Sequence, residues 1–153
     1  MSEDKTRINI KKKDFIMWLY HSIAPETRGH TTIDKLAYLI ETELRNIGYS
    51  TGYEFNEDIF GPFDQGLDRD IEIMTVKQDV FNDPEIIKIG EPMHTHKVGL
   101  TPQGKYYFIN IVRPRLRKIL GDYYTELTKK IKQLSSLNSA DVVKLARKKY
   151  QCL

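Results

Sequence analysis

The sequence is poor in cysteine and contains no long apolar run. Cys152 is the only cysteine among 153 residues, so no disulfide can form within the chain. A missing disulfide framework is typical of proteins from a reducing compartment. No 18-residue apolar run is present, and the first residues are Met-Ser-Glu-Asp followed by charged side chains. We therefore expect a cytoplasmic protein with neither a membrane-spanning segment nor a secretion signal.

Patterns that support catalysis or cofactor binding are also missing. There is no glycine-rich phosphate loop, and Ser135, Ser136 and Cys152 have no base at a recognisable spacing. His94 and His96 alternate along the chain, which on a strand would place both imidazoles on one face. Two ligands without a cysteine or carboxylate pair do not make a metal site. We expect no enzyme activity, no cofactor and no metal.

Charge is distributed unevenly along the chain. Residues 1–100 contain twelve Lys/Arg and eighteen Asp/Glu, a net charge of −6, whereas residues 101–153 contain twelve Lys/Arg and three Asp/Glu, a net charge of +9. Such an asymmetry concerns partners and solubility rather than the fold. Two further interpretations stay open: the two regions attract each other, or the basic third is a solvated helix face.

The amino-terminal half predicts a tail followed by two helices. Residues 1–11 are polar and lysine-rich and are expected to form a flexible tail. The first helix is predicted over 12–23, and Thr31 or Thr32 begins the second, which Gly48 ends in a left-handed cap. Their apolar stripes are Phe15, Ile16, Trp18, Leu19 and Ile23, and then Ile33, Leu36, Ala37, Leu39, Ile40, Leu44 and Ile47.

The middle of the chain predicts a third helix and a β-hairpin. A short extended segment over 53–60 and a Gly61-Pro62 turn precede a helix over 64–74, which Asp64 caps. The hairpin strands are expected from Val76 onward, with a break at Asn82-Asp83-Pro84, and over 94–100. Thr101 then caps another helix, with a proline in its first turn. This order predicts an α+β, mostly α fold: a winged helix-turn-helix domain over 12–112 with a short β-hairpin wing.

These segments resemble a group of small prokaryotic winged-helix proteins, the YwgA-like and SocA/Panacea-like domains. The matching residues are Lys35, Leu36 and Tyr38, then Phe60, Gly61, Pro62, Phe63 and Leu67, and finally Leu100, Thr101 and Gly104. The resemblance covers about residues 12–112, and Phe63-Asp64 stands where those proteins often have Tyr-Ser. It implies the winged-helix fold and no catalytic site. Some relatives act as antitoxins or adaptors through protein contacts, whereas winged-helix regulators bind operators.

Residues 113–153 are expected to form a C-terminal helical extension. The helix that begins at Thr101 should bend or break at Pro114, because proline removes a backbone donor. An apolar stripe then continues at helical spacing through Leu116, Leu120, Tyr123, Leu127, Ile131 and Leu134. Ser139 is expected to cap a last helix. The stripe needs a cover, and its layout resembles the extensions of PadR-like regulators, so we expect a homodimer that pairs through it.

The predicted DNA-binding residues lie at the start of the first helix, on the third helix, on the wing and in the first turn after the wing. They are Lys11, Lys12, Lys13, Gln65, Arg69, Lys88, Lys97 and Lys105. Lysines at such places contact phosphates and carry no sequence information. Arg69 is surrounded by Asp68, Asp70 and Glu72, so it either reaches a base or phosphate or neutralises its acidic neighbours. The acidity of this helix favours the second role.

The sequence therefore indicates a non-enzymatic, DNA-associated winged-helix protein. We expect a transcription regulator that binds double-stranded DNA mainly through phosphate contacts. The alternative is a protein-interaction adaptor or antitoxin-type module, whose protein partner would bind the acidic surface around Glu57, Asp58, Asp68 and Glu72. A shared fold leaves the ligand open.

Overall fold

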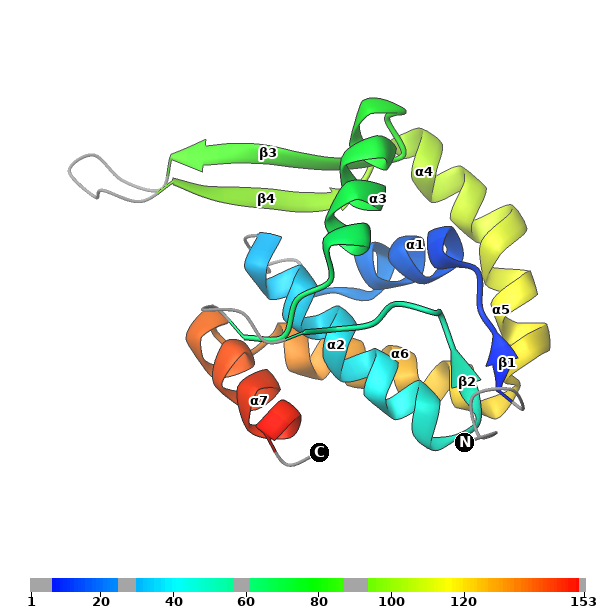
Figure 1. The fold of residues 1–153 in the computed structure, drawn as a ribbon. Helices are drawn as coiled ribbons and strands as arrows, with labels where there is room; N and C mark the ends of the chain where they lie inside the picture. Colours follow the sequence, from blue (N-terminus) through cyan, green and yellow to red (C-terminus); the bar gives the residue numbers. More distant parts are fainter. Residues whose placement is uncertain (1–6, 25–29, 57–60, 87–93, 152–153) are drawn as a thin grey trace.

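The computed structural model describes residues 7–24, 30–56, 61–86 and 94–151. The fold is α+β and mostly helical, as predicted (Figure 1). The elements are β1 (Ile8–Asn9), α1 (Lys12–Ser22), α2 (His30–Asn46), β2 (Tyr49–Ser50), α3 (Gln65–Val76), β3 (Val80–Ile86), β4 (His94–Leu100), α4 (Pro102–Tyr107), the π-helix η2 (Phe108–Val112), α5 (Arg113–Leu120), α6 (Asp122–Ser135) and α7 (Ser139–Gln151). In the described parts of the chain, no helix combines the length and the apolarity needed to cross a membrane.

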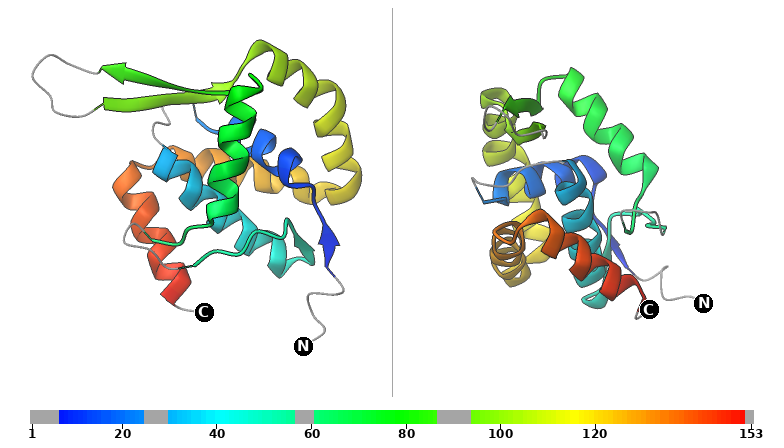
Figure 2. Two further views of the ribbon diagram at one scale, coloured as in Figure 1. Left: turned by 45° about the horizontal axis from the view of Figure 1, so that its top comes forward. Right: turned by 90° about the vertical axis from the view of Figure 1, so that its left-hand side faces the viewer.

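Helix α1 lies at the centre of the structure. It packs against α2, α6, η2 and β4, and the two views in Figure 2 show it between α3 and the C-terminal helices. Every residue from Asp14 to Tyr20 is buried, so α1 has no solvent-facing stripe in this stretch. A helix that is apolar all round requires neighbours on every side. The surrounding helices are therefore parts of one core.

The predicted flexible tail is wrong for its last residues. Strand β1 pairs in parallel with β2, and Ile8 N donates to Gly48 O at 2.8 Å. Ile10 is completely buried. Burial of this isoleucine supplies the driving force that the polar composition of 1–11 concealed. Residues 1–6 of the predicted tail lie outside the described residues.

The three predicted N-terminal helices are present, but α2 already begins at His30, so neither Thr31 nor Thr32 is its cap as predicted. The other caps agree with the prediction. Gly48 has a φ of +93° after α2, and Asp64 Oδ1 accepts a hydrogen bond from Leu67 N at 3.1 Å at the start of α3. However, residues 47–64 separate α2 from α3. The turn of a helix-turn-helix motif is only about 3–4 residues long. The two helices thus follow the predicted order without forming a compact helix-turn-helix unit.

The predicted hairpin is present, but its break at Asn82-Asp83-Pro84 is not. Strand β3 runs through these residues and pairs antiparallel with β4 from Val80↔Leu100 to Ile86↔His94. Pro84 is tolerated because each strand of a two-stranded hairpin has a free edge, where no partner needs the missing N–H. The hairpin projects away from the helices (Figure 1).

The helix that begins after Thr101 is interrupted twice. The π-helix η2 directly precedes Pro114, which occupies the first turn of α5. A wider turn can accommodate the proline ring and the lost donor without a sharp bend. The second interruption is at Gly121, whose φ of +58° separates α5 from α6. The expected continuous helix through Leu116–Leu134 is therefore two helices.

The apolar stripe of these helices is covered by the domain itself. Leu116 and Ile131 are completely buried, Leu120 and Leu127 are 2% and 6% exposed, and Leu134 packs against the core. Of the predicted dimerisation residues, only Tyr123 is well exposed, at 43%. An uncovered stripe was the reason for expecting dimerisation through this surface. That reason is gone, and homodimerisation itself stays a prediction.

Direct contacts join this extension to the amino-terminal helices. The Trp18 ring stacks on Tyr124 at 5.5 Å, and its Nε1 donates to Thr128 Oγ1 at 2.9 Å. Arg115 forms two hydrogen bonds with Asp14, at 2.8 and 2.9 Å. Helix α7 packs along α2, and it is capped by Asn138 rather than Ser139, through Oδ1 and the Asp141 N–H. Residues 113–153 therefore belong to the same core as the helices before them.

We predict that replacing Leu120 and Leu127 with Glu unfolds the chain and does not merely dissociate it. The free energy of unfolding should fall by more than about 3 kcal/mol, because each change buries an unpaired carboxylate in place of a packed side chain. Urea denaturation followed by circular dichroism measures this. Tyr123→Glu is the matched control and should change stability by no more than about 1 kcal/mol. A well-folded monomeric double variant of a dimeric parent chain would contradict the expectation.

Candidate nucleic-acid interface

Helix α3 presents one face to solvent beside the hairpin. Figures 1 and 2 show α3 on the outside of the helical body, close to the base of β3 and β4. Leu67, Ile71 and Met74 anchor its inner face in the core. Its exposed residues are Gln65, Gly66, Arg69, Glu72, Ile73 and Val76. The outer face is therefore mixed: polar toward the amino-terminal end and apolar toward the carboxyl-terminal end.

Two of the carboxylates that made this helix look acidic are engaged within the fold. The Tyr53 hydroxyl donates to Asp70 Oδ2, which ties α3 to the segment after β2. Burial and the Asp70 carboxylate raise the pKa of Tyr53, so the hydroxyl keeps its proton. Asp64 caps α3 through Oδ1 and accepts from Glu54 N through Oδ2 at 2.7 Å. Fewer negative charges face outward than the sequence indicated.

The sequence favoured a role for Arg69 in neutralising its acidic neighbours, and that role stays a prediction, because Arg69 forms no direct ion pair with them among the described side chains. The side chain is exposed and makes no ion pair with any carboxylate in the described parts of the chain. Gln65 is exposed one turn before it on the same face. These two side chains are consequently available to a ligand.

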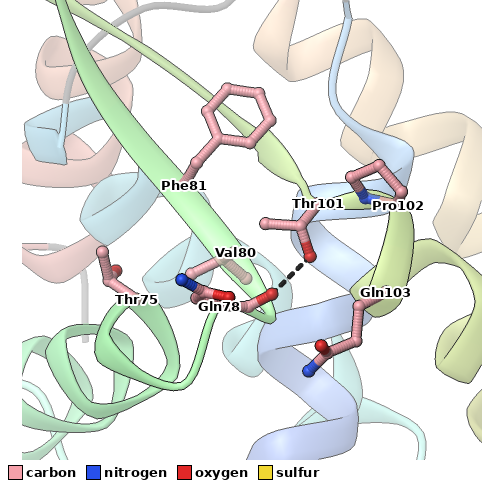
Figure 3. Close-up of a pocket in the computed structure, with 7 residues that line it drawn as sticks. All are labelled: Thr75, Gln78, Val80, Phe81, Thr101, Pro102 and Gln103. Atoms are coloured by element: carbon pink, nitrogen blue, oxygen red, sulfur yellow. Dashed lines mark hydrogen bonds between the residues drawn. The ribbon is translucent and has the colours of Figure 1, made fainter.

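The turn after α3 is hydrogen-bonded to the residue that precedes α4, at the base of the hairpin (Figure 3). The Thr101 hydroxyl donates to the Gln78 carbonyl and accepts from Gly104 N at 3.0 Å, so it also caps α4. Gln78 has a φ of +64°, which reverses the chain between α3 and β3. The sequence pattern Thr-x-x-Gly thus joins the start of α4 to the turn between α3 and β3.

Gly104 belongs to this junction because no side chain fits there. A Cβ at this position would lie 2.0 Å from the Asp79 carbonyl oxygen. Gln103 Nε2 reaches the Asp79 carboxylate at 3.3 Å. An open hollow of about 520 Å³ lies alongside, lined by Thr75, Gln78, Val80, Phe81, Thr101, Pro102 and Gln103 (Figure 3). Residues from the end of α3, the start of β3 and the start of α4 line this hollow.

A groove runs between the start of α1 and the second half of α3. It has a volume of about 330 Å³ and is lined by Lys12, Lys13, Asp70, Ile73, Met74, Lys77 and Asp79. Lys12 Nζ lies 4.9 Å from the centre of the Tyr53 ring, and Lys13 Nζ lies 4.8 Å from that of Tyr107. Lys13 also lies 3.5 Å from Asp79 Oδ2. Aromatic faces and this ion pair hold the ammonium groups in place.

The structure brings together some of the predicted DNA-binding residues. Lys12 and Lys13 share the groove with α3, and Lys11 is exposed just before them. Lys97 is exposed on β4, and Lys105 is exposed on α4. Lys88 lies outside the described residues, as do Glu57 and Asp58 of the alternative acidic surface.

Lys77 is a residue that the sequence reading missed. It follows the last residue of α3, is exposed, and lines the groove opposite Lys12. A cation at the carboxyl-terminal end of a helix is stabilised by the helix dipole, which is the signal that could have identified it. With Lys12 and Lys13 it places three ammonium groups around one groove.

The Gly61-Pro62 turn has a structural role in the described residues around it. The completely enclosed Lys35 donates from Nζ to the Pro62 carbonyl at 2.6 Å, and Gly61 has a φ of +103°. A Cβ on Gly61 would lie 3.3 Å from carbon atoms of Lys35 and Arg147. Three segments of the resemblance pattern thus serve packing: Lys35, Gly61-Pro62 and Thr101-x-x-Gly104.

Other kinds of site are not formed by the side chains that the structure describes. Among them, no three His, Cys, Asp or Glu side chains lie close enough to hold a metal ion. The side chains of His94 and His96 are outside this description. No model of a known protein family matches the sequence, and no curated protein is significantly similar to it. A functional proposal for this chain therefore rests on the geometry of this surface.

We predict that Gly104→Ala lowers the free energy of unfolding by about 1–3 kcal/mol, because the added methyl group overlaps the Asp79 carbonyl. Chemical denaturation of the purified chain measures this. Gly66→Ala is the control, because a Cβ there meets only the Asp64 side-chain oxygen, at 3.0 Å. It should change stability by less than about 1 kcal/mol. Equal stability of the two variants would show that Gly104 is not in close contact with the Asp79 carbonyl.

Proposed function

We propose that this chain is a non-enzymatic winged-helix protein that associates with DNA, as a transcription regulator. In this proposal α3 takes the place of the recognition helix and β3–β4 that of the wing. The observation that supports this proposal is the arrangement of α3 on the outside of the helical body with the projecting hairpin at its end (Figure 1). Three lysines, Lys12, Lys13 and Lys77, line the groove beside α3. The resemblance to YwgA-like and SocA/Panacea-like domains is part of the same proposal.

The charges around α3 support binding through phosphates. Lys12, Lys13 and Lys77 border the groove, and its two carboxylates already have partners in Tyr53, Lys13 and Gln103. A duplex whose major groove receives α3 would bring a phosphate strand alongside this helix. Lysines there neutralise phosphates and release counterions, which supplies affinity without sequence preference. Gln65 and Arg69 are then the side chains placed to read bases.

The alternative function is a protein-interaction adaptor, and one specific observation favours it. Ile73 and Val76 are 46% and 78% exposed on α3, next to the exposed Glu72. Exposed apolar side chains beside a carboxylate are more typical of a protein contact than of a DNA-reading helix. Replacing Val76 with Ser would separate the two functions, because it should weaken a protein contact while leaving phosphate contacts intact.

We predict that duplex affinity falls steeply with salt, with a log–log slope of about −0.9 for each phosphate neutralised. Lys12→Gln and Lys77→Gln should each make the slope less steep by about one phosphate. Fluorescence anisotropy with a labelled duplex at several salt concentrations measures both. No binding at about 50 mM salt, or binding insensitive to salt, would overturn the proposed function in this form.

Lys129→Gln is the matched control for this series. Lys129 is exposed on α6, which lies on the other side of α1 from α3 (Figure 2). Its removal changes the net charge by the same amount as the groove variants. The control should keep the parent slope, which separates a local phosphate contact from a general charge effect.

We further predict that Arg69→Ala weakens binding to a preferred duplex by about 1–3 kcal/mol and relaxes the preference at one base pair. The preferred duplex is obtained by selection from a randomised library. Arg69→Lys should keep the salt slope but lose the same base preference, because lysine lacks the planar fork that binds guanine. Unchanged preference in both variants would show that α3 does not read bases.

A further inference from the structure

We propose that the groove between α1 and α3 is a binding site for a small organic carboxylate with an apolar body. This inference rests on the proposed function in one respect, since the same lysines are assigned to phosphate contacts. Binding of such an anion would therefore compete with the duplex. The groove would give the protein a ligand that regulates its association with DNA.

The floor of the groove is apolar. Met74 is 4% exposed, and Ile73 is 46% exposed at the edge. The groove volume of about 330 Å³ lies within the range of small-molecule sites, roughly 300–1,000 Å³. Covering Ile73 with a hydrocarbon body removes apolar surface from water. This part of the groove offers nothing to an inorganic ion.

The rim of the groove carries an excess of positive charge. Asp79 is occupied by Lys13 and Gln103, and Asp70 by the Tyr53 hydroxyl. Lys12 and Lys77 have no carboxylate partner among the residues that the structure describes. The Tyr53 hydroxyl is a neutral donor, so three lysines against two carboxylates leave the rim with one net positive charge, which matches one carboxylate of a ligand. A charge-assisted contact with such a group is stronger than one with a neutral polar group.

Apolar floor and cationic rim together define the chemical class. Acetate would meet the lysines but leave Ile73 uncovered, whereas a neutral amide would cover Ile73 without meeting the charge. A carboxylate on a short aliphatic chain satisfies both. Inorganic phosphate meets only the rim. The fit of these four compounds therefore tests the assignment one feature at a time.

The experiment titrates the full chain with hexanoate, hexanamide, acetate and inorganic phosphate, without DNA. Backbone amide chemical shifts report where each compound binds. Hexanoate should bind about tenfold more tightly than any of the other three, with shifts at Lys12, Ile73 and Lys77. Equal affinity for hexanoate and acetate, or shifts confined to other surfaces, would overturn the proposed site.

Variants then separate charge from apolar contact. Lys77→Gln should weaken hexanoate binding about threefold to fivefold and leave hexanamide unaffected, as expected for a partly exposed ion pair. Ile73→Asn should weaken both compounds. Lys129→Gln should bind hexanoate like the parent chain. Loss of hexanoate binding in Lys129→Gln to the same extent would show that net charge, rather than the groove, attracts the anion.

The proposed competition between the carboxylate and the duplex is measured in a separate experiment. Saturating hexanoate should weaken duplex binding at constant ionic strength, whereas hexanamide should not. Hexanoate binding without any effect on a bound duplex would overturn the regulatory role. Hexanoate binding by a chain that binds no duplex would overturn the proposed function and leave the carboxylate site standing.

Discussion

The burial of α1 from Asp14 to Tyr20 is the constraint on which the other elements depend. Asp14 is 2% exposed within this helix, so its carboxylate needs a partner, and Arg115 supplies two hydrogen bonds from α5. The Asp14 contact also raises the pKa of Arg115, which keeps the guanidinium charged. Removing one member of a pair whose carboxylate is buried leaves an uncompensated charge. Helix α5 is thus held beside α1 by this pair as well as by apolar packing, and its position sets where α6 can cover Trp18.

The charge asymmetry of the sequence is partly consumed by contacts of this kind. Arg115 pairs with Asp14, and Lys130 lies 3.0 Å from Glu43, so basic residues of the C-terminal third meet acidic residues of the first hundred. The interpretation that the two regions attract each other is therefore confirmed for these residues. What remains of the basic charge is distributed over several helices. The lysines near α3 matter for a ligand because aromatic rings and Asp79 position them, not because the net charge is high.

Regular local patterns in the sequence predicted the parts of the fold that depend on local chemistry. Apolar spacing located α1, α2 and α3, and Asp64 and Thr101 were identified as caps from their own side chains. The predictions that were wrong concerned features that depend on tertiary contacts. Pro84 could remain in β3 because its edge is free, Ile10 was fixed by β2, and the stripe from Leu116 was covered by α1 rather than by a second copy. No local pattern states which neighbour covers an apolar face.

The same reasoning explains why the candidate surface was only half predictable. Lys12, Lys13, Gln65 and Arg69 could be nominated because residue type suffices for a phosphate or base contact. The groove could not be predicted from the sequence. It forms only because Lys12 on α1 and Lys77 after α3, which are distant in the sequence, lie on opposite sides of it. Nor could the sequence show that Asp70 turns inward to Tyr53. That hydrogen bond ties one oxygen of Asp70 to the fold, while Asp70 still lines the groove, where three lysines outnumber two carboxylates.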